Sequence, residues 1–516
     1  MEQDEVLRYD VFEAAIHSTR ECDNPYAVDI TGVFRDEQGN TLNVTGFYDG
    51  ADCYKVRFMP ECVGCWDYSL QLNGCTVKED RFLCRNSEIK GPLRQDPVYP
   101  YHFVFSNGLP FYMMGNTAYH AILSYRQHKE EFCNFLDYYQ QRRFNWIRFF
   151  LLGASKSNLD DEIWPWGGTS AQPDFARINQ KTFRDAEGVI QELTRRNMIA
   201  SVILLTSPSL AGFSASSDKL KACKDYFRYA VSRLGAYWNV VWNVSNEWNK
   251  FGINSVEEID ELGEYLHSID PYRRLTACHH YARFEFFDRD WTDMSSLQHR
   301  GLPCEINRVI LQNRIFNKIV LNEEYGYEGD NNRPPNDADN VRHDHWAIAM
   351  AGGFGTYGDK TKGQGTGAYF SARLADAAGT EAPDKLRFLP SFMENTGYQS
   401  MTPANAYLSS CNPEEVFCLA EIGREYIVYL VRGQTFKLNL SHARLLKACW
   451  YNPRSGEYLT AWEIRVPQSM LEVPMENEGD KGWYKMYKEQ NISFTPPDCE
   501  NDWVLHLKEV STEGGV

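Results

Sequence analysis

Short runs in which hydrophobic and polar residues alternate occupy the two ends of the chain. At the N-terminal end these runs are separated by Gly, Asn, Asp and Pro, and a β pattern returns near the C-terminus. Alternation with a period of two is typical of strands with one buried face, and closely spaced short strands favour an antiparallel sandwich. We therefore predict an immunoglobulin-like β-sandwich over residues 1–92 and a second β-sandwich over residues 399–516. The predicted strands are 26–30, 33–35, 41–44, 54–58 and 66–72, then 425–431, 436–440, 448–451 and 503–507.

The pattern changes in the middle of the chain. Over residues 93–398, apolar runs alternate with amphipathic stretches of helical period. This alternation is typical of repeated βα units, and eight units in about 250 residues match a (β/α)8 barrel. The predicted fold class is therefore α/β, a TIM barrel flanked by two antiparallel β-sandwiches. The predicted barrel strands are 111–114, 146–150, 199–204, 240–244, 275–278, 294–297, 319–322 and 351–355, and the predicted helices include 130–142, 180–197, 219–234 and 256–269.

Charge narrows the range of partners. The formal net charge is −17, and the 53 Lys and Arg residues form no basic cluster. Nucleic acids and anionic membranes attract basic clusters, so neither is expected as a partner. The acidic start, Met1 to Glu5, lacks the basic and apolar segments of a signal peptide, and no run of 18 apolar residues follows. We therefore expect a cytoplasmic protein.

Two glutamates follow apolar runs at predicted strand ends, where a TIM barrel carries its chemistry. Glu247 comes after 240–244 and is preceded by Asn246, and Glu324 comes after 319–322. Hydrolysis of a glycosidic bond needs two carboxyl groups, one protonated to release the leaving oxygen and one ionised to attack the anomeric carbon. Glu247 and Glu324 fit these two tasks.

An Asn-Glu pair after the fourth strand and Glu-aromatic-Gly after the seventh resemble glycoside hydrolase clan A. The resemblance implies that Glu247 is the acid/base and Glu324 the nucleophile, since Glu324-Tyr325-Gly326 matches the spacing and the neighbouring Glu323 does not. It also implies that Asn246 binds the sugar 2-hydroxyl and that Arg148, on the second strand, orients the nucleophile. For Arg148, a buried ion pair within the barrel is an alternative that the residues leave open.

The loop 115–120, Gly-Asn-Thr-Ala-Tyr-His, is similar to the Gly-Asp-Thr-Ala-Trp motif of the apiosidase-like family, with Asn116 and Tyr119 in place of Asp and Trp. The flanks are similar as well. Residues 24–26, 46–50 and 56–60 resemble the N-terminal sandwich found before such barrels, and residues 450–457 resemble a collagen-binding-type C-terminal sandwich. The resemblance therefore covers nearly the whole chain.

Other residues near the predicted strand ends are candidates for sugar contacts. For Trp166, in the long loop after the second strand, packing in the core is an equal alternative, because Trp is highly buried on average. Histidines at the strand ends could instead be a metal set, but a metal site needs three or more convergent ligands and a retaining glycosidase needs no metal, so no metal and no cofactor are expected. The candidates are Asn116, Tyr119, His120, Trp166, Trp248, His280, Gln298, Tyr325 and Trp346.

The expected function is that of a retaining glycoside hydrolase without a cofactor, acting on a carbohydrate and by exo attack on plant-type or other oligosaccharides. Exo action is expected because a cytoplasmic enzyme would meet small imported substrates, and long βα loops can close a pocket. The alternative is a carbohydrate-binding protein on a degenerate barrel that has lost turnover. The presence of both Glu247 and Glu324 favours the enzyme.

Overall fold

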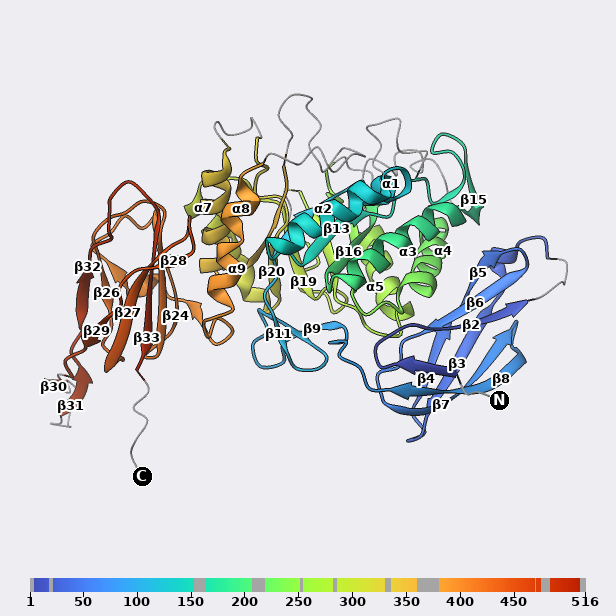
Figure 1. Cartoon of the computed structure of the whole chain (residues 1–516), viewed down its shortest axis with the longest axis horizontal. Helices are drawn as coiled ribbons and strands as arrows, with labels where there is room; N and C mark the ends of the chain where they lie inside the picture. Colours follow the sequence, from blue (N-terminus) through green and yellow to red (C-terminus); the bar gives the residue numbers. More distant parts are fainter. Residues whose placement is uncertain are drawn as a thin grey trace. The chain divides into compact units, whose positions relative to one another are not determined.

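The structure is a computed structural model (Figure 1). It describes residues 4–17, 22–152, 163–206, 219–250, 254–281, 285–329, 336–359, 380–468, 470–474 and 483–510. The Cα positions divide the chain into two compact units. One comprises residues 1–298, 316–324 and 356–379, and the other comprises residues 299–315, 325–355 and 380–516.

The N-terminal strands form two sheets around an aromatic core. Rings of Phe12, Phe34, Phe58 and Phe82 meet between the sheets, with Phe34 and Phe58 stacked at 4.0 Å. The strand predicted at 26–30 is wrong at its start, because the Asn24 side chain and Pro25 begin a 3-10 helix there, η1 (Pro25–Ala27). One sheet has the order β1 (Asp4–Leu7), β8 (Cys75–Arg85), β7 (Gly64–Leu72), β3 (Ile30–Asp36) and β4 (Thr41–Thr45), and the other β2 (Phe12–His17), β6 (Cys53–Phe58) and β5 (Phe47–Gly50).

Eight strands close a barrel in chain order, which confirms the predicted fold class. Six of the eight predicted strands overlap the observed ones closely. The first prediction, 111–114, is wrong, because β11 (Pro110–Phe111) pairs instead with β10 (Phe103–Phe105), next to β9 (Leu93–Gln95). The last, 351–355, starts too early, because Ala351 and Gly352 form a turn after the preceding helix and the strand begins at Phe354. The barrel strands are β12 (Gly115–Thr117), β13 (Trp146–Phe150), β16 (Ile199–Thr206), β17 (Val240–Asn246), β18 (Thr276–His280), β19 (Met294–Leu297), β20 (Ile319–Asn322) and β21 (Phe354–Tyr357).

Helices follow the barrel strands, and side-chain caps mark where several of them begin, α3 and α5 among them. The Asn179 side chain accepts from the backbone N–H of Thr182 at the start of α3, and Ser255 and Glu258 form a capping box on α5. The helices predicted at 219–234 and 256–269 have those bounds in the structure. None of the described helices is long and apolar enough to cross a membrane. The helices are α1 (Ala121–Gln127), α2 (Lys129–Gln141), α3 (Gln180–Arg195), α4 (Lys219–Leu234), α5 (Val256–Ile269), α6 (Pro303–Asn313) and α7 (Ala338–Met350).

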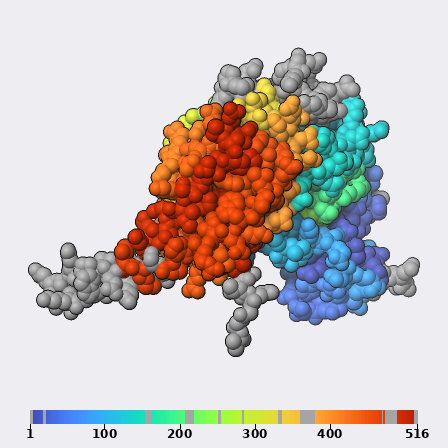
Figure 2. Space-filling model, turned by 60° about the vertical axis from the view of Figure 1, so that its left-hand side comes forward, coloured from blue at the N-terminus to red at the C-terminus, as the bar shows by residue number. Residues whose placement is uncertain are grey.

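The C-terminal strands pack into a sandwich whose surface is coloured orange to red in Figure 2. Its larger sheet packs on α7, where Trp346 stacks on Tyr429 at 5.2 Å. Beside this stack, Arg342 of α7 donates to both carboxylate oxygens of Asp502, at 2.9 and 3.0 Å. The larger sheet has the order β22 (Thr402–Pro403), β24 (Val416–Glu421), β25 (Glu425–Leu430), β33 (Trp503–Glu509), β27 (Leu445–Asn452) and β28 (Glu457–Tyr458), with β29 (Trp462–Arg465) also on β27.

Shorter elements complete the second unit and one loop of the first. The smaller C-terminal sheet has the order β23 (Leu408–Ser409), β26 (Phe436–Asn439) and β32 (Asn491–Phe494). The remaining elements are the hairpins β14 (Trp166–Gly168) with β15 (Pro173–Ile178) and β30 (Met470–Pro474) with β31 (Trp483–Tyr487), the helices α8 (Ala382–Leu386) and α9 (Phe388–Met393), and the 3-10 helices η4 (Arg314–Phe316) and η6 (Asn405–Tyr407).

Candidate active site

Glu247 is the residue directly after β17, and it is almost fully buried. Its φ of 47° lies in the left-handed region, which a side chain other than glycine rarely adopts and which is often found at functional sites. Its carboxylate binds the ammonium group of Lys250 through both oxygens, at 2.6 and 2.7 Å. Its backbone N–H donates to Nδ1 of His279 at 3.4 Å. The side chain is therefore held at the end of the strand.

The surroundings of Glu247 favour its protonated form. Burial is the largest influence and raises the pKa of the Glu247 carboxyl, and the negative charge of Glu324 raises it further. The ammonium group of Lys250 and the guanidinium group of Arg148 act in the opposite direction without outweighing burial and Glu324. A carboxyl group whose pKa is raised in this way suits a general acid.

Glu324 is the second residue after β20, and the side chains of Tyr119, Arg148 and His279 lie around its carboxylate. The hydroxyl of Tyr119 donates to its Oε1, and Nη1 of Arg148 donates to the same oxygen at 3.4 Å. Nε2 of His279 lies 4.0 Å from Oε1. Burial raises the pKa of Tyr119 well above its usual value, so its hydroxyl keeps its proton at neutral pH. These contacts hold the carboxyl group of Glu324 in one orientation.

Arg148 links this carboxylate to the neighbouring strand. It is completely buried on β13, its Nη1 also donates to the hydroxyl of Tyr119 at 2.8 Å, and its Nη2 donates to Oδ1 of Asn246. Its Nε lies 3.4 Å from the carboxylate of Glu323. Arg148 is therefore a buried ion-pair partner of Glu323 that also contacts Glu324 and Asn246.

Three further predicted residues lie at strand ends in the same unit. Asn116 is buried on β12, and its side-chain oxygen has no hydrogen-bond partner among the described residues. His120, buried just before α1, has a pKa that burial lowers to about 4, so it is neutral at pH 7. Gln298, half-buried after β19, donates its backbone N–H to the carbonyl of His280 at 3.1 Å.

The structure corrects the predicted roles of His280 and Trp248. Successive strand residues point to opposite faces, so on β18 the side chain that approaches Glu324 is that of His279. His280 instead places Nδ1 3.1 Å from the carbonyl of Ser296 and packs its ring on Trp248. Trp248 in turn packs on Phe286 at 5.1 Å. His280 and Trp248 thus belong to an aromatic cluster on the other face of the strand.

Trp166 is also a core residue. It lies on β14 with no exposed surface, 4.9 Å from the ring of Tyr226 on α4, 5.1 Å from that of Trp164 and 5.4 Å from that of Phe175. The alternative of core packing is the one that the structure supports.

Trp346 and Tyr325 have partners within the second unit. Trp346 lies inside α7, not at a strand end, and is covered by Tyr429. The hydroxyl of Tyr325 lies 2.9 Å from Nδ1 of His345, which is also on α7. A subsite role for Trp346 is therefore wrong, because its indole is enclosed by the C-terminal sheet.

Sequence reasoning gave no functional role to Lys250, which contacts Glu247, or to Glu323, which is an ion-pair partner of Arg148. Strand alternation on β18 could have distinguished His279 from His280, whereas nothing in the sequence indicates that Lys250 folds back on Glu247. Among the described residues, no group of three or more His, Cys, Asp or Glu side chains could hold a metal ion.

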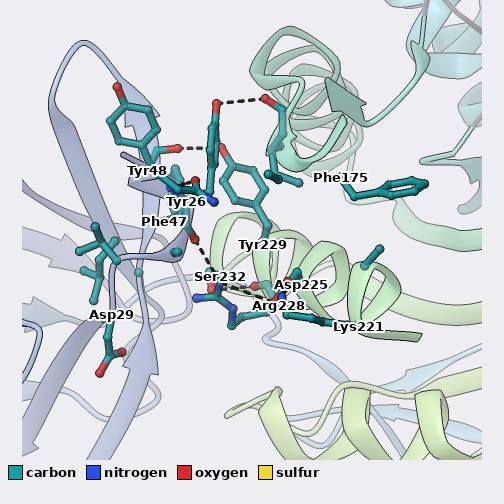
Figure 3. A pocket seen from close by; sticks show the side chains of 18 residues that line it. Tyr26, Asp29, Phe47, Tyr48, Phe175, Lys221, Asp225, Arg228, Tyr229 and Ser232 are labelled. Atoms are coloured by element: carbon teal, nitrogen blue, oxygen red, sulfur yellow. Dashed lines mark hydrogen bonds and ion pairs between the residues drawn. The ribbon is translucent and has the colours of Figure 1, made fainter. Parts of the chain in front are cut away.

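A pocket of about 740 Å³ lies elsewhere in the first unit, between the N-terminal sandwich, β15 and α4 (Figure 3). None of the predicted site residues lines it. Tyr26 donates to the carbonyl of Ile178 at 3.0 Å, and Tyr229 donates to the carbonyl of Tyr48 at 2.9 Å. These bonds join the N-terminal sandwich to β15 and to α4.

Comparison with known protein families gives one match over more than half of the chain. Residues 100–365 match the model described as "Apiosidase-like, catalytic domain". The chain belongs to the apiosidase-like family. In this apiosidase-like protein, residues 5–73 match a domain of unknown function and residues 408–508 match a "Putative collagen-binding domain of a collagenase". Family membership supports a glycosidase that acts on a carbohydrate.

Solved structures share the fold of this apiosidase-like protein. A "putative glycoside hydrolase" from Bacteroides vulgatus ATCC 8482 has a TM-score of 0.80 and 20% identity, over 98% of this chain and 100% of that chain. A glycoside hydrolase family 5 protein from the same organism has a TM-score of 0.62 and 17% identity, over 83% of this chain and 96% of that chain. None of the curated proteins compared with the chain matches it.

Proposed function

We propose that the protein is a retaining glycoside hydrolase in which Glu324 is the nucleophile and Glu247 the acid/base. The observation that carries the proposal is the contrast between two buried carboxyl groups. Glu324 accepts hydrogen bonds from Tyr119 and Arg148, while burial and the charge of Glu324 raise the pKa of Glu247. Two carboxyl groups in such different surroundings suit the two roles of glycoside hydrolysis.

In the first step, a carboxylate oxygen of Glu324 attacks the anomeric carbon as the bond to the leaving oxygen breaks. Glu247 gives its proton to that oxygen, so the leaving group departs as an alcohol. In the second step, the ionised Glu247 takes a proton from water, and the water oxygen displaces Glu324 from the anomeric carbon. The sugar leaves with its original anomeric configuration, and both glutamates return to their starting states.

Asn246 and Arg148 support this proposal as positioning groups. The Asn246 amide accepts from Arg148 through its oxygen, which leaves its nitrogen to donate to a sugar hydroxyl. The proposed substrate is an oligosaccharide with a terminal sugar that is removed by exo attack.

The test is a screen of aryl glycosides with the wild type, Glu247→Ala and Glu324→Ala, with Glu264→Gln on the exposed face of α5 as the control. We expect hydrolysis by the wild type and the control, and its loss in both alanine variants. NMR of the first product formed should show the anomeric configuration of the substrate. Azide should restore turnover of Glu324→Ala and give a glycosyl azide of inverted configuration, because it replaces the missing nucleophile.

Two results would count against the proposal. The first is that the wild type and all variants bind sugars but do not release the aryl group. The protein would then be a carbohydrate-binding protein on a degenerate barrel. If the first product had the inverted configuration, Glu324 would act as a general base and not as the nucleophile.

A further inference from the structure

Glu323 immediately precedes the proposed nucleophile, and its side chain also enters the barrel. Neighbouring residues of a strand point to opposite faces, but β20 ends at Asn322, and Glu323 and Glu324 lie in the turn that follows. The Glu323 side chain is only 1% exposed. Two adjacent glutamates are therefore both turned inward at the end of one strand.

Three strands supply contacts to a single oxygen of Glu323, its Oε2. The hydroxyl of Ser296 on β19 donates to it, and the amide nitrogen of Asn243 on β17 donates to it at 3.4 Å. Nε of Arg148 on β13 lies 3.4 Å away as its ion-pair partner. Glu323 thus joins three strands at the level of the site.

The guanidinium group of Arg148 is shared between two carboxylates and an amide. Its Nε faces Glu323, its Nη1 faces Glu324 and its Nη2 faces Asn246. A guanidinium group is rigid and planar, so fixing one nitrogen fixes the directions of the other two. A buried carboxylate without a partner is strongly unfavourable, so the buried Glu323 is stabilised by its ion pair with the buried Arg148.

We propose that Glu323 is a positioning residue of the glycosidase site. It holds Nε of Arg148, and Arg148 in turn orients the carboxylate of Glu324 and the amide of Asn246 toward the substrate. Glu323 itself does not touch the sugar. This inference rests on the proposed function, because it assigns to Glu323 the geometry on which attack by Glu324 depends.

The test compares Glu323→Gln and Ser296→Ala with the wild type on an activated aryl glycoside. Glu323→Gln keeps the shape of the side chain and removes its charge, so we expect kcat to fall about 10- to 100-fold, as for a misplaced reacting group, with KM changed less than about threefold. Ser296→Ala removes one of the two neutral donors that orient Glu323 and should lower kcat by a smaller factor.

A matched control and a double-mutant cycle separate positioning from stability. Asp293 is another carboxylate of the barrel, but it lies just before β19, at the opposite end of that strand from the site, and accepts from the backbone N–H of Thr276 at 2.8 Å. Asp293→Asn should therefore change stability and leave kcat within about twofold. In an Arg148→Met background, Glu323→Gln should lower kcat little further, because both substitutions break the same chain of contacts from Glu323 through Arg148 to Glu324. Full additivity in this cycle would overturn the inference.

Covalent labelling separates failure of this inference from failure of the proposed function. A 2-deoxy-2-fluoro aryl glycoside should label Glu324, seen by peptide mass spectrometry, in both the wild type and Glu323→Gln. If the wild type hydrolyses glycosides and Glu323→Gln keeps full kcat, only the inference fails. Labelling of Glu323 in place of Glu324 would overturn both the inference and the assignment of Glu324 as the nucleophile. If the wild type hydrolyses no glycoside, the proposed function fails first.

Discussion

The hydroxyl of Tyr119 makes two polar contacts that a single substitution can remove. It donates to Glu324 and accepts from Arg148 at 2.8 Å, while its ring stacks on Phe150 at 4.2 Å. Tyr119→Phe keeps the ring and its stacking. A hydrogen bond to a charged group contributes about 1.5–3 kcal/mol, and about 1.4 kcal/mol corresponds to a tenfold change in rate. We therefore expect kcat/KM to fall by about 10- to 100-fold, because Glu324 loses its hydroxyl donor.

Tyr226→Phe is a matched control for this variant. Tyr226 is as deeply buried and donates its hydroxyl to the carbonyl of Leu204 at 3.0 Å, but this bond lies away from both glutamates. Steady-state kinetics on an aryl glycoside and urea unfolding should be measured for both variants. Both should lose stability by about 1–3 kcal/mol, since each leaves a buried polar group without its partner. Equal kcat/KM in the two variants would refute the assignment of Tyr119 to the site.

Three other predictions concern charge and packing. Lys250→Met removes an ammonium group that lowers the pKa of Glu247, so that pKa should rise and the basic limb of the kcat/KM profile should move to higher pH; an unmoved limb would contradict the ion pair. Asp502→Ala leaves the buried Arg342 without its bidentate partner and should cost about 3–5 kcal/mol by urea unfolding at pH 7. Burial is the largest influence and raises the pKa of Asp502, but Arg342, His343 and Arg454 together lower the pKa overall. The wild type should therefore lose this stabilisation as pH falls below about 4, and a variant with unchanged acid sensitivity would argue against the pair. Trp346→Ala should lower the free energy of unfolding by about 3–5 kcal/mol and leave KM unchanged, because the indole packs on Tyr429. A raised KM would indicate that Trp346 contacts the substrate.

The sequence by itself determined the barrel and the two glutamates. Strand and helix periodicity are local properties, so β13, β19 and β20 have the predicted bounds. A polar residue that directly follows an apolar barrel strand lies at the C-terminal end of that strand, which is the end where TIM barrels carry their active sites. For this reason the order of residues along the chain is enough to place Glu247 and Glu324 at that end of the barrel.

The tertiary structure decided what surrounds these two residues. Which of His279 and His280 faces inward depends on the pleat of β18 within the closed barrel, and the inward direction of Glu323 depends on where β20 ends. The sequence predicts that Trp346 contacts the sugar, but its ring stacks on Tyr429, which lies far along the chain in the C-terminal sheet. Such contacts between distant residues have no periodicity to reveal them, because they form only when separate elements pack together.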